Sequence, residues 1–182
     1  MIAVRGPRLN AERTACPRSD LRFESTSGDS RDDEVDGVDE TDWALLAHLQ
    51  ENSRLSLREL SRRVHLSAPA VAERVRRLEE SGVITGYHAA VDLEAAGRPV
   101  VAFIRMSCYG SHCVLRDPDV PSWPEIQEIH RVTGDACSLL KVATGSMAGF
   151  ERLIDRLAPY GQPSSTLVLS TPLARRPVIP EP

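Results

Sequence analysis

Apolar residues recur with helical spacing in three consecutive segments between residues 38 and 80. In the first segment, Trp43, Leu46 and Leu49 follow one another at intervals of three, which places them along one side of a helix. Asp39 precedes them with the short polar side chain of an N-cap, and further acids suit the positive helix end. We predict a helix that follows Asp39 and runs to about Gln50.

The second and third segments carry their own start signals. Ser56 and Glu59 have the spacing of a capping box, in which each side chain bonds the other residue's backbone N–H, and they predict a short helix over 57–64. Ser67 is an N-cap followed by Pro69 in the first turn, where a missing N–H costs nothing. With Gly82 at the end, these signals predict a helix over 68–80.

The last two helices are joined by a short turn, which is typical of a helix-turn-helix. Residues 83–87 and 88–91 follow with the pattern of two short strands, so we predict a β-ribbon wing. The range 38–91 is therefore expected to be a winged helix-turn-helix domain.

Beyond a linker predicted at 92–98, the pattern changes to that of strands and one further helix. Strands are predicted at 100–106, 126–132, 136–144 and 165–171, and a helix is predicted from Ser146 to near Gly161. Gly134 and Asp135 are predicted as a two-residue hairpin turn, because glycine supplies the positive φ of a type II′ turn.

With a helical connection between the first two strands, the order is βαββαβ, a ferredoxin-like sandwich over 99–178. Three prolines between 118 and 124 leave little room for that connecting helix. The predicted fold class is α+β, with an N-terminal winged helix-turn-helix and this C-terminal domain. Residues 1–37 lack apolar periodicity and are predicted as a disordered tail, and 179–182 as a short C-terminal tail.

Composition adds a location and a charge pattern. The chain has 182 residues, of which 41% are hydrophobic and 26% charged, and no apolar run is long enough to cross a bilayer, so we expect a cytoplasmic protein. Four cysteines without a CxxC pair fit a reducing compartment. The net charge of −4 argues against nonspecific coating of nucleic acid, but residues 54–77 hold seven arginines against two acids. That local excess is the electrostatic pattern of a DNA-binding face.

Four stretches of the chain resemble the Lrp/AsnC family of feast/famine transcriptional regulators. They are DETDWALLAHL at 39–49, LSAPAVAERVRRLEESGVI at 66–84, HRVTGDACSLLKV at 130–142 and YGQPSSTLVLST at 160–171. The resemblance implies that the second domain binds a small molecule, usually an amino acid, which modulates DNA binding. It also implies assembly into dimers and then octamers. The chain departs from the family at 111–124, which is short for the first sheet-covering helix, and at Cys137, where the family often has an acid.

The third predicted helix has a polar face opposite its apolar stripe. Its arginine forks suit the two major-groove acceptors of guanine, and Glu73 can accept from cytosine N4. Arginines before this helix, Arg58 among them, are expected to contact phosphates. The candidate DNA-binding residues are Arg54, Arg62, Arg63, Ser67, Pro69, Ala70, Glu73, Arg74, Arg76 and Arg77. The alternative is a solvated helix face held by the pairs Glu73–Arg77 and Arg76–Glu80.

By the same resemblance, the turn at 134–135 and the segment after Gly161 meet between subunits to bind the effector. Asp135 would accept from an ammonium, backbone N–H groups and hydroxyls would receive a carboxylate, and Cys137 would line the side-chain pocket. The candidate effector-binding residues are Gly134, Asp135, Cys137, Ser164, Ser165 and Thr166. The alternative is an ordinary turn, a small buried thiol and ordinary strand residues.

Two other classes of function have less support. Cys108, His112 and Cys113 cluster in sequence, with Cys137 as a further zinc ligand, but the spacing C-x3-H-C matches no structural zinc pattern. We expect no metal site and no cofactor other than the effector. GxGxxG, Walker A, HExxH and GxSxG motifs are absent, so we expect no catalytic residues and no enzyme.

The sequence therefore predicts a nucleoid-associated, homo-oligomeric regulator that binds double-stranded DNA under control of an amino acid. An architectural protein that wraps DNA with little effector response is the alternative.

Overall fold

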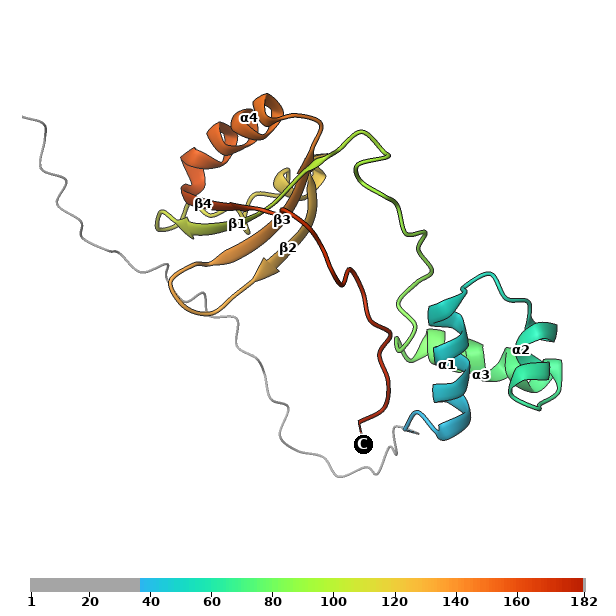
Figure 1. Ribbon diagram of the computed structural model, residues 1–182. Helices are drawn as coiled ribbons and strands as arrows, with labels where there is room; N and C mark the ends of the chain where they lie inside the picture. Colours follow the sequence, from blue (N-terminus) through green and yellow to red (C-terminus); the bar gives the residue numbers. More distant parts are fainter. Residues whose placement is uncertain (1–36, 182) are drawn as a thin grey trace, which may run out of the picture. The chain divides into compact units, whose positions relative to one another are not determined.

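The computed structural model describes residues 37–181, which divide into two units (Figure 1). The helical unit holds residues 37–90 together with 171–181, and the sheet unit holds 91–170. No helix in the described range combines the length and apolarity needed to cross a bilayer. The tail predicted at 1–37 lies almost wholly outside the described residues.

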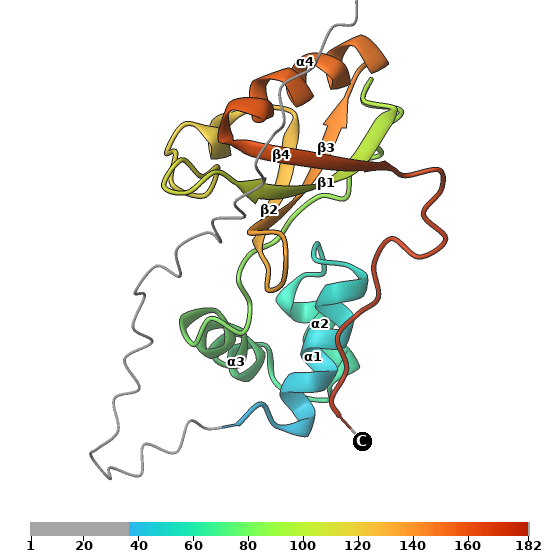
Figure 2. The ribbon, with the colours of Figure 1, turned by 90° about the vertical axis from the view of Figure 1, so that its left-hand side faces the viewer.

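The helical unit contains α1 (Glu40–Glu51), α2 (Leu57–Arg63) and α3 (Ala68–Glu80) (Figure 2). The three predicted helices are confirmed, and each begins where its capping signal lies. The Asp39 carboxylate accepts from the backbone N–H of Asp42 at 2.7 Å. Ser56 and Glu59 form the capping box, and the Ser67 hydroxyl accepts from Ala70 at 3.3 Å.

A small apolar core joins these helices. Leu45, Leu49, Leu60 and Val71 form its buried centre, and Ile84 packs against it after α3. Leu45 is fully buried whereas Trp43 is only partly buried. The buried face of α1 is therefore rotated by about one residue from the predicted face of Trp43, Leu46 and Leu49.

The predicted wing strands at 83–87 and 88–91 are wrong, because the structure forms no strand within 83–91. The backbone N–H of Ile84 instead donates to the carbonyl of Leu78 at 2.9 Å, and the Tyr87 hydroxyl donates to Glu79 at 2.8 Å. An isolated two-stranded ribbon is marginal in water, and this segment has no third strand beside it. Burial and the bond to Glu79 raise the pKa of Tyr87 to about 12.

The sheet unit is a four-stranded antiparallel sheet with one covering helix. Its elements are β1 (Val100–Cys108), β2 (Ile126–Arg131), β3 (Ser138–Thr144), α4 (Met147–Leu157) and β4 (Gly161–Leu167), with short 3₁₀ turns η1 (Val120–Ser122) and η2 (Ala158–Tyr160). The strand order is β2-β3-β1-β4, which is that of a ferredoxin-like sheet. Figure 1 shows α4 lying across one face. The core of this unit is the apolar surface between that face and α4, which includes Ile104, Leu140 and Leu153.

Three sequence expectations for this unit need correction. The first helix of βαββαβ is reduced to η1, because Pro118, Pro121 and Pro124 remove the N–H groups that a longer helix needs. The hairpin turn is a loop of six residues, 132–137, between the paired Arg131 and Ser138. β4 starts at 161 instead of 165.

The early start of β4 has a steric cause. A Cβ on Gly161 would lie 2.3 Å from the carbonyl oxygen of Ser107, so only glycine allows the backbones to approach so closely. Gly161 pairs with Cys108 at the first position of the β1–β4 ladder.

The segment after β4 is extended. At its end the Gln50 side chain donates to the carbonyl of Val178 at 2.9 Å and accepts from its N–H at 2.8 Å. Residues 171–181 thereby add to the helical unit.

Candidate nucleic-acid interface and effector site

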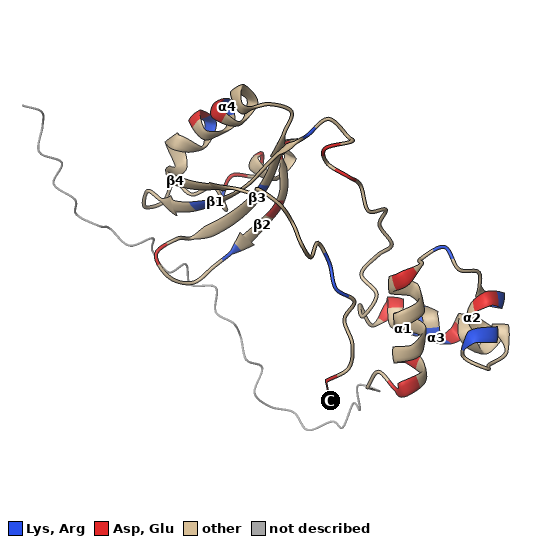
Figure 3. Cartoon of the chain, in the orientation of Figure 1, with Lys and Arg blue, Asp and Glu red and all other residues tan. Residues whose placement is uncertain are grey.

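The arginines in and just before α2 form an exposed cationic group. Arg54, Arg58 and Arg62 make no salt bridge with any described residue, and Figure 3 shows basic residues along α2. The Arg62 side chain donates to the carbonyl of Arg58 at 3.2 Å, and the Arg63 side chain lies 3.5 Å from a ring nitrogen of His48. Cations held in this way remain able to meet phosphate oxygens.

The arginines of α3 behave differently. Arg74 bonds Asp39 and Asp42, and Arg77 bonds Asp42 at 2.8 Å. The Asp42 side chain is 1% exposed, so two arginines of α3 compensate one buried carboxylate of α1. The hydrogen bond from Arg74 lowers the pKa of Asp39. The sequence did not predict this anchoring role, and DNA contact by Arg74 and Arg77 stays a prediction.

Arg76 lies on the exposed face of α3. It bonds Glu73 and Glu80, one on either side along the helix. The pair Arg76–Glu80 of the alternative reading is confirmed, and Arg76 also bonds Glu73. The hydrogen bond from Arg76 lowers the pKa of Glu73. Both acids are exposed, so exchange for phosphate or base contacts costs little.

The first turn of α3 presents small side chains. Ser67 and Pro69 are exposed and Ala70 is partly buried. The Ser67 hydroxyl already caps the helix, as its bond to Ala70 shows. This turn lets the helix end approach another molecule closely.

In the sheet unit, the predicted effector residues come from the loop before β3 and from β4. Gly134 has φ +101° in the loop 132–137, so the loop takes a conformation that favours glycine. Asp135 is exposed, and its carbonyl accepts from the Ser107 hydroxyl at 3.1 Å. Cys137 donates its N–H to the carbonyl of Met106 at 2.8 Å, which fixes the loop against β1.

The three hydroxyl residues of β4 divide between the two faces of the sheet. Ser164 pairs with Arg105 and Thr166 with Phe103, so both share the face away from α4. Ser165 pairs with Ile104 and lies on the opposite face, where Ile104 enters the core. A single ligand on one face therefore reaches Ser164 and Thr166 but not Ser165.

Three cysteines come together beside this loop. The sulfur atoms of Cys108, Cys113 and Cys137 all lie within 4.8 Å of one another, and those of Cys113 and Cys137 are 3.7 Å apart. His112 is not part of this group, and its ring stacks on Tyr160 at 5.0 Å between centroids. Burial raises the pKa of the Cys108 and Cys113 thiols.

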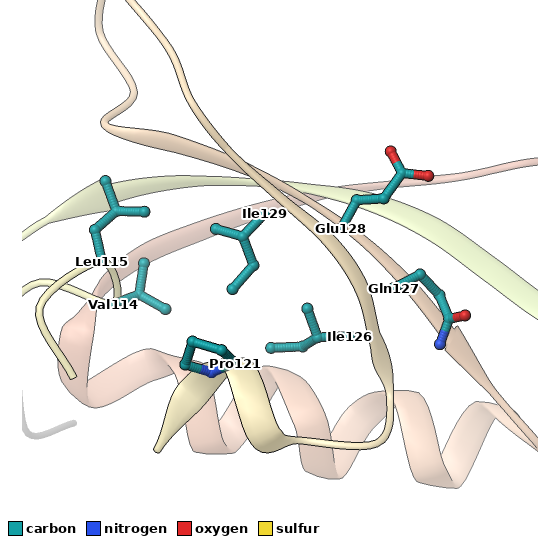
Figure 4. Close-up of a pocket in the computed structure, with 7 residues that line it drawn as sticks. All are labelled: Val114, Leu115, Pro121, Ile126, Gln127, Glu128 and Ile129. Atoms are coloured by element: carbon teal, nitrogen blue, oxygen red, sulfur yellow. The ribbon is translucent and has the colours of Figure 1, made fainter. Parts of the chain in front are cut away.

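A pocket that the sequence did not predict lies beside β2. It has a volume of about 330 Å³, at the small end for ligand pockets. Figure 4 shows Val114, Leu115, Pro121, Ile126 and Ile129 facing one another, with Gln127 and Glu128 to one side. The pocket borders the segment where the covering helix is missing. No local sequence signal predicts it, because its walls come from η1, β2 and the loop after β1.

A helix-turn-helix with an exposed arginine group, followed by an antiparallel α/β domain, defines a two-domain DNA-binding regulator. Matches to known families agree: residues 38–85 match the winged helix-turn-helix DNA-binding model, and residues 118–178 match the Lrp/AsnC ligand binding domain. The chain belongs to the Lrp/AsnC family and is a transcriptional regulator, not an enzyme.

The matches to individual relatives span nearly the whole length of each relative. The chain is 42% identical over 134 residues to YezC, an uncharacterized HTH-type transcriptional regulator of Bacillus subtilis, covering 74% of this chain and 95% of that one. A Neisseria meningitidis regulator solved with L-Met has a TM-score of 0.71 at 32% identity, covering 77% and 95%. A Mycobacterium tuberculosis feast or famine regulatory protein solved with L-methionine has a TM-score of 0.70 at 32% identity, covering 79% and 99%.

Proposed function

We propose that this regulator binds double-stranded DNA as a homo-oligomer and that an amino acid bound in the sheet unit modulates the binding. The observation that carries the DNA contact is the difference between α2 and α3. The exposed arginines in and just before α2 supply phosphate contacts, while the Asp42 carboxylate of α1 holds α3 in place. Arg76, released from Glu73 and Glu80, reads base edges from the exposed face of α3.

Assembly uses the sheet face away from α4. In the described chain no helix covers that face, and Phe103 is 38% exposed on it. The paired residues Arg105 and Leu139 lie on the same face. A second copy covering this surface makes a dimer whose two recognition helices enter major grooves about 34 Å apart.

The effector proposal rests on loop 132–137 and on the relatives solved with L-methionine. The Asp135 carboxylate is exposed and accepts from the ammonium of a bound amino acid. The hydroxyls of Ser164 and Thr166 donate to the carboxylate of the same amino acid. These two groups lie on opposite sides of β1: the loop leads into β3, where Ser138 pairs with Met106, and β4 pairs with the other side of β1, where Ser164 is opposite Arg105. A partner subunit seated on the open face brings them to one ligand. The assembled protein acts on DNA in the nucleoid.

The first test is fluorescence anisotropy on the duplex upstream of the protein's own gene and on a scrambled duplex, across salt concentrations. Neutralising about six phosphates per dimer predicts a log–log salt slope of about −5. We expect Arg58→Ala and Arg62→Ala to weaken binding to both duplexes, and the matched control Arg152→Ala, at an exposed position of α4, to leave binding unchanged. Equal affinity for both duplexes favours an architectural protein, and a flat salt slope contradicts direct DNA binding.

The second test is a thermal melt with a panel of amino acids that starts with L-methionine. One amino acid should raise the melting temperature of the wild type, and Asp135→Ala should abolish the rise. Asp155→Ala, which removes an exposed carboxylate of α4, is the control. A rise that survives Asp135→Ala places the effector elsewhere.

A further inference from the structure

Three cysteines that are separate in sequence meet in one place in the sheet unit. Cys108 is the last residue of β1, and the chain then reverses through Gly110, which has φ +54°, so that Cys113 returns beside Cys108. Cys137 arrives from the loop before β3. Cys108 and Cys113 are 8% and 5% exposed, and Cys137 is half-buried.

The spacing of the sulfur atoms fits a metal ion. With Zn–S bonds of about 2.3 Å, two sulfurs lie about 3.8 Å apart in a tetrahedral site and about 4.0 Å apart in a planar trigonal one. The Cys113–Cys137 separation is 3.7 Å, and every pair lies within 4.8 Å. An ion therefore needs only small shifts of the side chains.

The surrounding structure holds these residues in place. Tyr160 bonds Asp117 at 2.6 Å, stacks on His112 and accepts from the backbone N–H of Tyr109, which pins the turn that carries Cys113. The N–H of Cys137 is fixed to the carbonyl of Met106. These contacts fix the positions of the cysteines, and a specific metal site needs ligands that are held in place by the residues around them.

We propose that Cys108, Cys113 and Cys137 form a three-thiolate site for a soft metal ion, with Zn(II) favoured over Cu(I). On binding, each S–H loses its proton to solvent and forms an S–metal bond, so three protons are released. Three thiolates leave a net charge of −1 around Zn(II) and −2 around Cu(I), and an apolar surrounding favours the smaller charge. Three protein thiolates leave a fourth position of Zn(II) for a solvent molecule, and Cys137 is the half-buried member of the three.

This site does not depend on the proposed amino-acid effector or on DNA binding. It has one structural consequence for the loop, because Cys137 lies two residues after Asp135. A bound ion ties the end of loop 132–137 to β1 and to the turn at 109–113. Binding therefore stabilises the sheet unit by mass action.

The test uses the full chain without a histidine tag, reduced and handled without oxygen. Co(II) is added first, because thiolate charge-transfer absorbance reports the number of sulfur ligands. Zn(II) and Cu(I) affinities are then measured separately against chromophoric chelators. We expect one ion per chain, charge-transfer intensity typical of three thiolates, tighter retention of Zn(II), and a higher melting temperature for the metal-bound protein.

Variants locate the site. Cys137→Ser and Cys113→Ala should each weaken Zn(II) binding by more than about 100-fold, because even outer-shell substitutions cost 10–100-fold. The matched control is Cys16→Ser, at the one cysteine of the sequence that is not among the three proposed ligands, and it should leave affinity unchanged. If Cys113→Ala fails to fold, Cys137→Ser at the half-buried position still decides the question, since its Co(II) spectrum should lose one thiolate.

Several results overturn the proposal. One is that the protein takes up less than one ion per chain in competition with the chelator. The three cysteines would then be ordinary buried thiols that pack in the core. Another is an equal loss of affinity in Cys16→Ser and Cys137→Ser. A third is a Cys113–Cys137 disulfide in protein isolated under reducing conditions, because those sulfurs are no longer thiolates.

Discussion

The two units of this regulator are stabilised in different ways. The helical unit has a small apolar core and places a buried carboxylate, Asp42, between two arginines of α3. The sheet unit has a larger, continuous apolar core between α4 and one sheet face, including Ile104, Leu140 and Leu153. Ion pairs between α1 and α3 therefore help to hold together the unit that carries the candidate DNA-binding arginines. In the other unit, Cys108 and Cys113 belong to the apolar core and Cys137 packs against it.

The stability of each unit can be measured separately, because each unit contains one of the two tryptophans. Trp43 lies in α1, and Trp123 packs against the core of the sheet unit. In a Trp123→Phe background fluorescence reports the helical unit, and in a Trp43→Phe background it reports the sheet unit.

The largest effect is expected from the sheet core. Leu153→Ala should lower the free energy of unfolding by about 2 to 5 kcal/mol, because it leaves a cavity in a fully buried site. Denaturant titration followed by Trp123 measures this change, and the Trp43 transition should move little. If both transitions shift together, the units unfold cooperatively and the division into two independent cores is wrong.

The next effect tests the use of charge in the helical unit. Asp42→Asn should destabilise that unit by about 1 to 3 kcal/mol, since it removes the charged acceptor shared by Arg74 and Arg77. The Trp43 transition reports the change. Glu51→Gln, an exposed acid at the end of α1, is the control and should stay within about 0.5 kcal/mol. Equal effects of the two substitutions would remove the argument for a structural ion pair.

A comparable effect is expected where β4 meets β1. Gly161→Ala should cost about 1 to 3 kcal/mol in the Trp123 transition, because the new Cβ meets the Ser107 carbonyl and forces the strands apart. Gly149→Ala in α4 is the matched control: its Cβ meets only side-chain atoms at 3.5 Å or more and should be neutral or stabilising. If Gly161→Ala left the free energy of unfolding unchanged, β4 would be able to move away from β1 at little cost.

The smallest effect is a dependence on pH. The folded-state pKa of Asp39 lies below its usual value of 3.8, chiefly because of the hydrogen bond from Arg74. A lowered pKa stabilises the fold above the unfolded-state value, and this contribution disappears as the pH falls through the folded-state value. The Trp43 transition should therefore weaken below about pH 4. Asp39→Asn should make that decline shallower, and an unchanged decline would assign it to other acids.

Local signals predicted the helical unit well. The capping patterns of Asp39, Ser56 and Ser67 placed three helices within a residue or so, because capping and helix periodicity act over four residues or fewer. The wing prediction failed for the converse reason: strands at 83–91 need a neighbour, and sequence pattern does not supply one. For the site, the sequence identified the basic segment but not that Arg74 and Arg77 bond to acids of α1, more than thirty residues away.

By itself, the sequence determined the family, the two-domain order, the helix starts and the basic segment around α2. Only the tertiary structure decided which arginines are anchored, where β4 begins, which face of the sheet Ser165 occupies, and that Cys137 joins Cys108 and Cys113. Each of these depends on contacts between residues far apart in the chain. The register of β1 with β3 and β4 sets those contacts, and a shift of one residue would send every side chain to the other face.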